Sequence, residues 1–224
     1  MSSKILVLPG DGIGVEVADQ AIRVIEKLNE QGLNASYEKD LVGGASYDVN
    51  GEPLTNSVLE KAKNSDAILL GAVGGSKWDD VERSKRPEAG LLGLRKELEL
   101  FANLRPALVF DALVSASTLK NEVVNNLDIM IVRELTGGVY FGQPRGIEDT
   151  PNGKKAIDTQ IYHDYEIDRI ARVAFDLARK RNNKVTSVEK ANVMETGVLW
   201  REIVKETHKD FSDITLENML ADNC

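Results

Sequence analysis

Short apolar runs alternate with amphipathic stretches along the first part of the chain. Lys4–Leu8 (KILVL) and Ala67–Val73 (AILLGAV) are compact apolar runs, which predicts two buried strands. Between them, Val15–Leu28 carries apolar residues at helical spacing, and Gly32 follows as a stop signal. The apolar face of this predicted helix holds Val17, Ala21, Val24, Ile25 and Leu28. Alternating strands and helices predict a mostly parallel sheet that is covered by helices.

Two further helices are expected in this part of the chain. Asn56–Lys63 precedes the second strand, with Thr55 or Asn56 as its N-cap. Glu88–Leu100 has leucines at helical spacing, and Pro87 suits a first turn. These leucines are Leu91, Leu92, Leu94 and Leu98.

The pattern changes near residue 100. Ala107–Val114 and Asp128–Arg133 predict strands, and Gly137–Ile157, which is rich in Gly, Pro, Asn and Asp, predicts a long hairpin or arm. The change predicts two domains, residues 1–100 with a βαβ pattern and residues 101–224 with a more antiparallel, arm-containing pattern.

Four more elements are expected in the second domain. They are a helix over Glu166–Arg179, a strand over Lys184–Val188, a helix over Leu199–Lys205 and the start of a helix at Asn218–Cys224. The first of these helices is amphipathic, with Ile167, Ile170, Val173, Ala174 and Leu177 on one face.

Composition narrows the possible functions. The 224 residues are 42% hydrophobic and 29% charged, an ordinary globular balance, and the net charge of -8 argues against non-specific nucleic-acid binding. We expect no signal peptide, and Ala67–Val73 is far shorter than the roughly 20 apolar residues that span a bilayer. The single cysteine, Cys224, excludes a disulfide framework within the chain. These features predict a cytoplasmic protein with neither a nucleic-acid nor a membrane partner.

The loop Pro9–Gly14 (PGDGIG) lies between the first predicted strand and helix. Such a loop can present backbone N–H groups to a ligand. Its glycines stand at positions 10, 12 and 14, which differs from the G-x-G-x-x-G spacing of the dinucleotide-binding fingerprint. A plain strand-to-helix turn that needs glycine for its backbone angles is an equally good interpretation.

Several arginines occupy settings suited to an anionic ligand. They are Arg95, Arg105, Arg133 and Arg145. Arginines that converge on one place can bind a dicarboxylate through paired hydrogen bonds. For any one of them alone, local pairing is the better interpretation, for example Arg95 with Glu99. For Arg133, at the end of an apolar strand, the neighbouring candidate is Glu134.

Three other residues carry candidate chemistry. Tyr140, flanked by glycines, is a competent proton donor, and Lys190 could act as a base if its surroundings favoured the neutral amine. Asp222 is one carboxylate, whereas hard cations need several oxygen ligands. Taken singly, each has a simpler interpretation: an arm tyrosine packed on a partner surface, an exposed lysine at a strand end and an aspartate at a helix start.

Five segments together resemble one family, in the right order along the chain. They are PGDGIGVEV at 9–17, GAVGGSKWD at 71–79, RPEAGLLGLRKELELFANLRPA at 86–107, IVRELTGGVYFGQPRG at 131–146 and EKANVMETGVLWREIV at 189–204. The chain is similar to the β-decarboxylating dehydrogenases of the isocitrate/isopropylmalate dehydrogenase family, and most similar to their isopropylmalate branch. The likeness covers essentially the whole chain.

This resemblance implies a fold and an activity. The fold is α/β, distinct from the Rossmann fold, with two domains and an arm that pairs across a homodimer whose active sites are shared. The activity is oxidative decarboxylation of 3-isopropylmalate in leucine biosynthesis, with reduction of NAD⁺ and a requirement for Mg²⁺ or Mn²⁺.

The resemblance also implies roles for individual residues. Arginines matching Arg95, Arg105 and Arg133 bind the substrate carboxylates. Lys190 matches the base for the substrate hydroxyl, Tyr140 the residue that protonates the enolate, and Asp222 the first aspartate ligand of the metal. The other residues matched to the substrate are Glu88, Leu91, Leu92 and Val193, and those matched to the cofactor are Ile13, Gly74, Gly75 and Asn192.

Substrate choice is expected to depend on Leu91 and Leu92, which would form an apolar wall for an isopropyl group. If the substrate carried a third carboxylate at the position of the isopropyl group, this wall would leave that carboxylate desolvated and unpaired. A related enzyme for tartrate, malate or homoisocitrate is the alternative within the class.

Roughly the last third of the family pattern does not appear in the sequence. We therefore expect a first domain that lacks its return strands, and a 224-residue chain that is inactive on its own. A non-catalytic dimerisation or interaction module is the alternative from another class.

Overall fold

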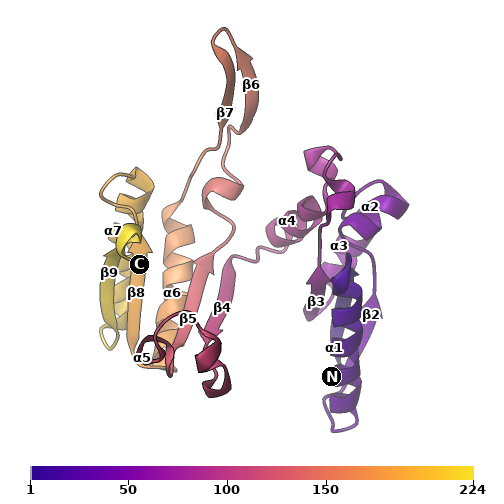
Figure 1. Cartoon of the computed structure of the whole chain (residues 1–224), viewed down its shortest axis with the longest axis horizontal. Coiled ribbons are helices and arrows are strands. Elements are labelled where there is room, and N and C mark those ends of the chain that lie inside the picture. The colour runs from indigo at the N-terminus through magenta and orange to yellow at the C-terminus, as the bar shows by residue number, and fades with distance from the viewer. Residues whose placement is uncertain (1) are drawn as a thin grey trace. The chain divides into compact units, whose positions relative to one another are not determined.

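The computed structural model describes residues 2–224 and divides the chain into two compact units (Figure 1). The first unit ends at Glu99 and the second begins at Leu100. Among the described residues, no helix is both long enough and apolar enough to cross a membrane.

The first unit is built on a three-stranded parallel sheet with the order β2-β1-β3. The strands are β1 (Ser3–Gly10), β2 (Ala35–Lys39) and β3 (Ala67–Ala72). The predicted parallel sheet and its two apolar strands are confirmed. The sequence analysis missed β2, because its only buried residue is Ala35 and no apolar run marks it.

Four helices belong to this unit. They are α1 (Ile13–Asn29), α2 (Gly44–Asn50), α3 (Asn56–Lys63) and α4 (Pro87–Glu97). The helices predicted near α1, α3 and α4 are confirmed, and α2 was missed. Thr55 is the N-cap of α3, since its hydroxyl accepts the Val58 N–H at 3.2 Å.

The predicted buried face of α1 is wrong. Ala18 and Ile22 are buried, whereas Val17, Val24 and Leu28 are exposed. The start of α1 lies so close to the sheet that a Cβ on Gly14 would come within 2.5 Å of backbone atoms of β1 and β3. Small residues at this contact determine which of two neighbouring apolar stripes faces the sheet, and periodicity alone does not distinguish the stripes.

The second unit contains two antiparallel pairs and one parallel pair of strands. The pairs are β4 (Ala102–Leu108) with β5 (Asp128–Glu134), β6 (Gly146–Thr150) with β7 (Gly153–Ile157), and β8 (Lys184–Glu189) with β9 (Thr215–Leu220). The β6–β7 hairpin projects from the rest of this unit, which confirms the predicted arm as a structural element (Figure 1). The helices of the second unit are α5 (Asn121–Val124), α6 (Asp164–Arg179) and α7 (Glu195–His208).

Two predicted elements of this unit are wrong. The strand expected over Ala107–Val114 ends at Leu108, and Asp111–Ala116 forms a 3₁₀ helix. Proline is usually excluded from strands, but Pro106 is tolerated in β4 because β4 is an edge strand.

The second error concerns the end of the chain. Residues expected to begin a helix at Asn218 continue strand β9 and then form a 3₁₀ turn over Ala221–Asn223. A short apolar segment does not distinguish helix from strand by periodicity, and pairing with β8 decides its structure.

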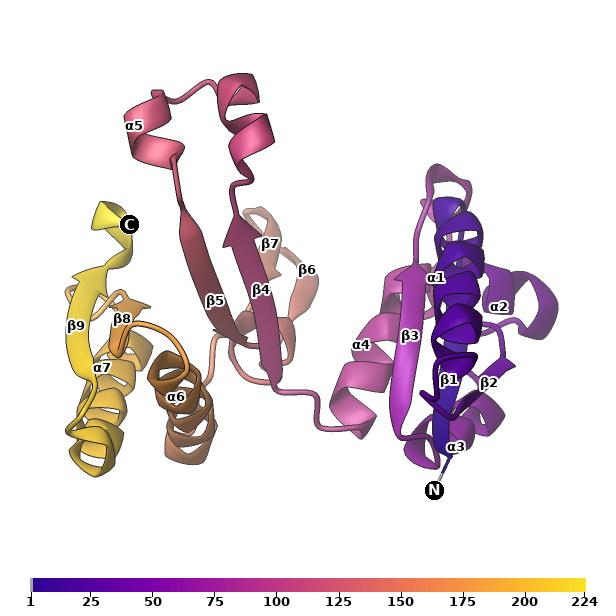
Figure 2. The ribbon, with the colours of Figure 1, turned by 90° about the horizontal axis from the view of Figure 1, so that it is seen from below.

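The core of the second unit lies where α6 and α7 pack together, and α6 also packs against β5 and β8 (Figure 2). Ile167 and Ile170 are buried as predicted, while Val173, Ala174 and Leu177 are only half-buried. The fully buried core cluster contains Ile167, Ala171, Phe175, Ala178, Val204, Phe211 and Ile214.

One exposed ion pair joins the end of α6 to the segment before β9. The Arg179 guanidinium donates to both carboxylate oxygens of Asp213, at 2.8 and 2.7 Å, and these bonds lower the pKa of Asp213 from 3.8 to about 2. A depressed carboxyl pKa contributes stability that is present above pH 3.8 and is lost as the pH falls through about 2.

We predict that Arg179→Met raises the pKa of Asp213 toward 3.8, because the cationic donor is removed. An NMR titration of the Asp213 carboxyl measures this change. Arg181→Met, which removes a guanidinium paired with Asp128 instead, should leave the pKa of Asp213 low. An unchanged pKa in Arg179→Met would contradict the assignment.

Candidate active site

In the first unit, candidate residues gather at the carboxyl ends of β1 and β3. A buried carboxylate, Asp11, connects three loops there. It accepts the N–H groups of Gly44 at 2.9 Å, Ala45 at 2.7 Å and Gly74 at 2.8 Å. Asp11 was not among the predicted site residues, although an aspartate directly after a buried strand was a usable signal.

The loop of glycines after β1 is a closed strand-to-helix turn. The N–H of Asp11 donates to the Ala72 carbonyl at 2.6 Å, and the N–H of Gly14 donates to the Asp11 carbonyl at 2.9 Å. Gly10 has φ 73°, and a Cβ there would lie 1.9 Å from the Ala72 oxygen. The simpler interpretation of this motif therefore accounts for its glycines, while Ile13 is exposed where α1 begins.

The structure brings the predicted cofactor residue Gly74 together with the predicted substrate residue Glu88. Gly74 has φ 107°, and a Cβ there would meet the Glu88 carboxylate at 2.6 Å. Its neighbour Gly75 lies against the ring of Trp78, whose indole N–H donates to Asp48 at 3.1 Å.

Helix α4 aligns the remaining candidates of this unit on one face. Glu88, Leu91, Leu92 and Arg95 are spaced i, i+3, i+4 and i+7, so they form one stripe. Leu91, Leu92 and Arg95 are half-buried, and Glu88 is exposed at the first turn. The stripe places two apolar side chains between one carboxylate and one guanidinium.

In the second unit, Arg105 and Arg133 lie on the same face of the β4–β5 pair. Arg105 is opposite Ile131 and Arg133 is opposite Asn103, so the two arginines are diagonal neighbours on adjacent strands. The Arg133 guanidinium also lies 5.3 Å from the centre of the Tyr140 ring, a cation–π contact.

The simpler interpretation that Arg133 pairs with Glu134 is wrong. Glu134 points to the opposite face, where its buried carboxylate pairs with Arg169 at 3.2 Å. The same carboxylate accepts the N–H groups of Thr136 at 3.2 Å and Gly137 at 2.7 Å. Glu134 therefore shapes the start of the loop that carries Tyr140.

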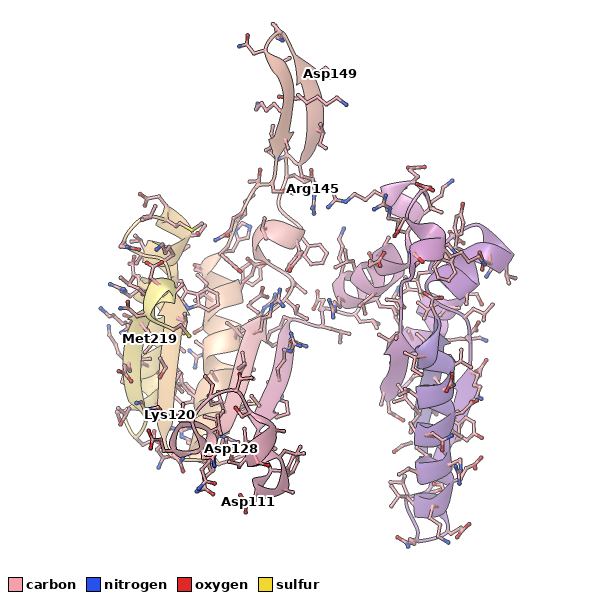
Figure 3. The ribbon with its side chains drawn as sticks, in the orientation of Figure 1. Asp111, Lys120, Asp128, Arg145, Asp149 and Met219 are labelled. Carbon is pink, nitrogen blue, oxygen red and sulfur yellow. The ribbon has the colours of Figure 1, made fainter. Side chains whose placement is uncertain are left out.

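Arg145 lies at the base of the arm and contacts residues there. It donates to the Tyr140 carbonyl and pairs with Asp158 at 3.2 Å. Figure 3 shows Arg145 where the arm leaves the rest of the unit, with Asp149 further out on the hairpin. Arg145 thus ties the base of the arm to the turn that contains Tyr140.

Lys190 and Asp222 meet because β8 and β9 are parallel neighbours. Glu189 and Leu220 are partners at the carboxyl ends of the strands, so the residues that follow them project from the same edge. The Lys190 ammonium donates to the Asp222 carboxylate. Among residues 2–224, no group of three or more His, Cys, Asp or Glu side chains could hold a metal ion, so Asp222 does not make a metal centre with its neighbours here.

A pocket of about 180 Å³ lies beside Lys190. It is lined by Gln160, Tyr162, Val188, Glu189, Lys190, Met194, Thr196, Gly197 and Trp200. Burial raises the pKa of Tyr162, and the carboxylates of Glu134 and Glu166 raise it further, against the opposing effect of Arg133. Of the predicted residues, Lys190 alone lines this pocket, while Asn192 and Val193 lie exposed in the turn that follows it.

Comparisons with known proteins identify the family. The family model described as isocitrate/isopropylmalate dehydrogenase matches residues 4–224. The chain belongs to the isocitrate/isopropylmalate dehydrogenase family, which confirms the resemblance and the fold class inferred from the sequence.

Relatives and a solved structure agree with this assignment. The chain is 61% identical over 223 residues to 3-isopropylmalate dehydrogenase of Rhodopseudomonas palustris, and 60% identical over 224 residues to the enzyme of that name from Pelagibacter ubique. It is similar to the crystal structure of isocitrate dehydrogenase from Methylococcus capsulatus, with TM-score 0.77 and 30% identity over 99% of this chain and 61% of that one. The two relatives are matched over 98% and 99% of this chain, which spans 60% and 61% of their own lengths.

We predict that Gly197→Ala destabilises the second unit, although Ala is normally favoured over Gly in a helix. A Cβ on Gly197 would lie 2.5 Å from the Lys190 carbonyl carbon and 2.6 Å from the Ala191 nitrogen, so α7 or the turn must shift. Overpacking of this kind costs about 1–3 kcal/mol. Hydrogen exchange of the β8 amides measures the loss for this unit alone.

The matched control is Val198→Ala, which shortens an exposed side chain on the same helix. Its effect should stay within about 0.5 kcal/mol. Equal exchange rates in Gly197→Ala and Val198→Ala would show that the contact tolerates a methyl group.

Proposed function

We propose that the protein oxidises and decarboxylates 3-isopropylmalate, with NAD⁺ as hydride acceptor and Mg²⁺ or Mn²⁺ as the required ion, in the leucine pathway. The main structural support for this proposal is that Arg105 and Arg133 lie on one face of the β4–β5 pair, with the Tyr140 ring against Arg133. The names of relatives about 60% identical to the chain support the choice of reaction.

The arginines would bind the two carboxylates of the substrate. Guanidinium groups on adjacent strands can pair with planar carboxylates through fixed, paired hydrogen bonds. In this proposal Arg95 supplies a third cation from α4. Leu91 and Leu92 on the same stripe would contact the isopropyl group, and Glu88, one turn earlier and close to Gly74, would contribute to the same substrate site.

Lys190 would take the proton of the C2 hydroxyl. In this structure the Lys190 ammonium donates to Asp222, and it can accept the substrate proton only after it has lost one of its own protons, which frees the lone pair of the neutral amine. NAD⁺ would accept the hydride from the substrate C2. The residues proposed to bind NAD⁺ are Ile13, Gly74, Gly75 and Asn192. Once CO₂ has left, Tyr140 would donate its phenolic proton to the carbon that carries the resulting electron pair.

Asp222 would be one oxygen ligand of the divalent ion. Residues 2–224 do not present a complete ligand group, so Asp222 would be only one of the oxygen ligands that a hard divalent ion needs. The arm, with Ile147 74% exposed, is proposed to pair with a second copy in a homodimer with shared active sites. The protein is proposed to act in the cytoplasm.

We predict that Lys190→Met in the full-length protein lowers kcat by a factor of about 10² to 10⁴, because the general base is lost. NADH formation with 3-isopropylmalate measures it. Lys184→Met, at the opposite end of β8 and paired with Glu217, should keep near-normal kcat. Near-normal turnover by Lys190→Met would show that Lys190 is a surface charge. Tyr140→Phe should slow the reaction less, since water can also protonate an enolate.

We also predict that replacing the leucines of the α4 stripe, as Leu91→Ser with Leu92→Asn, changes substrate choice. The apolar contact with the isopropyl group is worth about 10- to 200-fold in kcat/KM, so turnover of 3-isopropylmalate should fall much more than turnover of malate. Competing assays with both acids, and with tartrate and homoisocitrate, measure the ratio. Leu119→Ser, at an exposed leucine elsewhere, is the control, and equal losses for both substrates would refute the apolar wall.

A further inference from the structure

Glu189 is a buried carboxylate beside Lys190 for which the proposed reaction has no direct use. Its side chain is 2% exposed, at the last position of β8. One carboxylate oxygen accepts from the Nε of Arg201 at 2.9 Å and also from its Nη2, and the other accepts the backbone N–H of Ala191. Such a group is costly to bury unless every oxygen is bonded, and here both are.

These bonds hold the backbone on both sides of Lys190. Glu189 precedes it within the strand, and the bonded N–H of Ala191 follows it. The Lys190 carbonyl accepts the N–H groups of Val193 at 3.2 Å and Met194 at 2.9 Å. The freedom left to Lys190 is therefore mainly in its side chain, which faces the pocket and Asp222.

Arg201 connects this turn to helix α7. Its guanidinium donates from Nε and Nη2 to one oxygen of the Glu189 carboxylate, and these two bonds restrict the rotation of α7 more than a single bond would. One turn earlier in α7, Gly197 lies against the Lys190 carbonyl, and the Trp200 indole donates to Ser187 on β8 at 3.2 Å. Helix and strand are thus joined at three places around Lys190.

We propose that Glu189 and Arg201 are positioning residues that hold the Lys190 amine in its working place. The inference rests on the proposed function for the chemical role of Lys190. Misplacement of a reacting group by about 1 Å can cost about 10²-fold in rate, so a clamp on the lysine backbone has a direct kinetic consequence. Neither residue needs to touch the substrate for this effect.

The first test uses Arg201→Lys in the full-length protein. Lysine keeps the positive charge beside Glu189 but loses the paired geometry. We expect kcat with 3-isopropylmalate to fall about tenfold or more, with the KM changed less than about threefold. Arg179→Lys is the matched control, because Arg179 also donates two bonds to a carboxylate in the same unit but pairs with the exposed Asp213 away from Lys190, and it should leave kcat unchanged. Equal kcat in the two variants would overturn the proposal.

The second measurement does not depend on activity. The Lys190 ammonium donates to Asp222, and we expect this bond to slow hydrogen exchange of the ammonium, which ¹⁵N NMR spectra measure. We expect this exchange to accelerate in Arg201→Lys and in Glu189→Gln, whose amide cannot satisfy Arg201 and Ala191 in the same way. The rate should not change in Arg179→Lys. Unchanged exchange in both clamp variants would overturn the positioning role.

The two measurements separate the two proposals. If the wild-type protein forms no NADH with 3-isopropylmalate, the proposed function fails, while the exchange measurement still decides whether the clamp orients Lys190. Arg201→Lys is used because it leaves a cation beside the buried Glu189 charge, whereas an uncharged replacement of Arg201 would leave that charge unpaired and could unfold the protein.

Discussion

Strand pairing is the constraint on which the candidate residues depend in both units: the antiparallel pair β4–β5 places Arg105 and Arg133 on one face, and parallel pairs bring together the residues that follow their strands. Neighbouring parallel strands end at the same edge, so the residues that follow each strand are brought together whatever their separation in sequence. Pairing of β1 with β3 brings the loop at Asp11 to Gly74, and pairing of β8 with β9 brings Lys190 to Asp222. Without this pairing, residues more than thirty positions apart would share no surface.

Three buried carboxylates then shape the segments that leave the strands. Asp11 follows β1, Glu134 ends β5 and Glu189 ends β8. Each accepts at least one backbone N–H group of a nearby segment, and Glu134 and Glu189 also pair with an arginine. A carboxylate can accept several hydrogen bonds at once, so one side chain can fix a turn that would otherwise have many conformations. The half-buried Lys190 and the exposed Tyr140 therefore both lie on constrained backbone.

Prediction from the sequence succeeded where a local signal was strong. The apolar runs of β1 and β3, the Thr55 cap and the glycine-rich arm all follow from neighbours in sequence, and the structure contains each of them. Prediction failed where pairing with another strand decides whether a segment is a strand and where it ends, as at β2, at β4 with its internal proline, and at β9. The buried face of α1 failed for a related reason, since the close contact at Gly14 is a property of the packed sheet.

The sequence alone determined the family, the order of most elements and the identities of the candidate residues, because five motifs in order are far more specific than any one of them. Tertiary structure decided which of those residues meet. It placed Arg105 and Arg133 on one face and turned Glu134 toward Arg169, since alternation along paired strands depends on register. It also paired Asp11 with the Gly74 N–H in the first unit and Glu189 with Arg201 in the second, because burial and hydrogen bonding of a charged side chain exist only once distant segments have packed together.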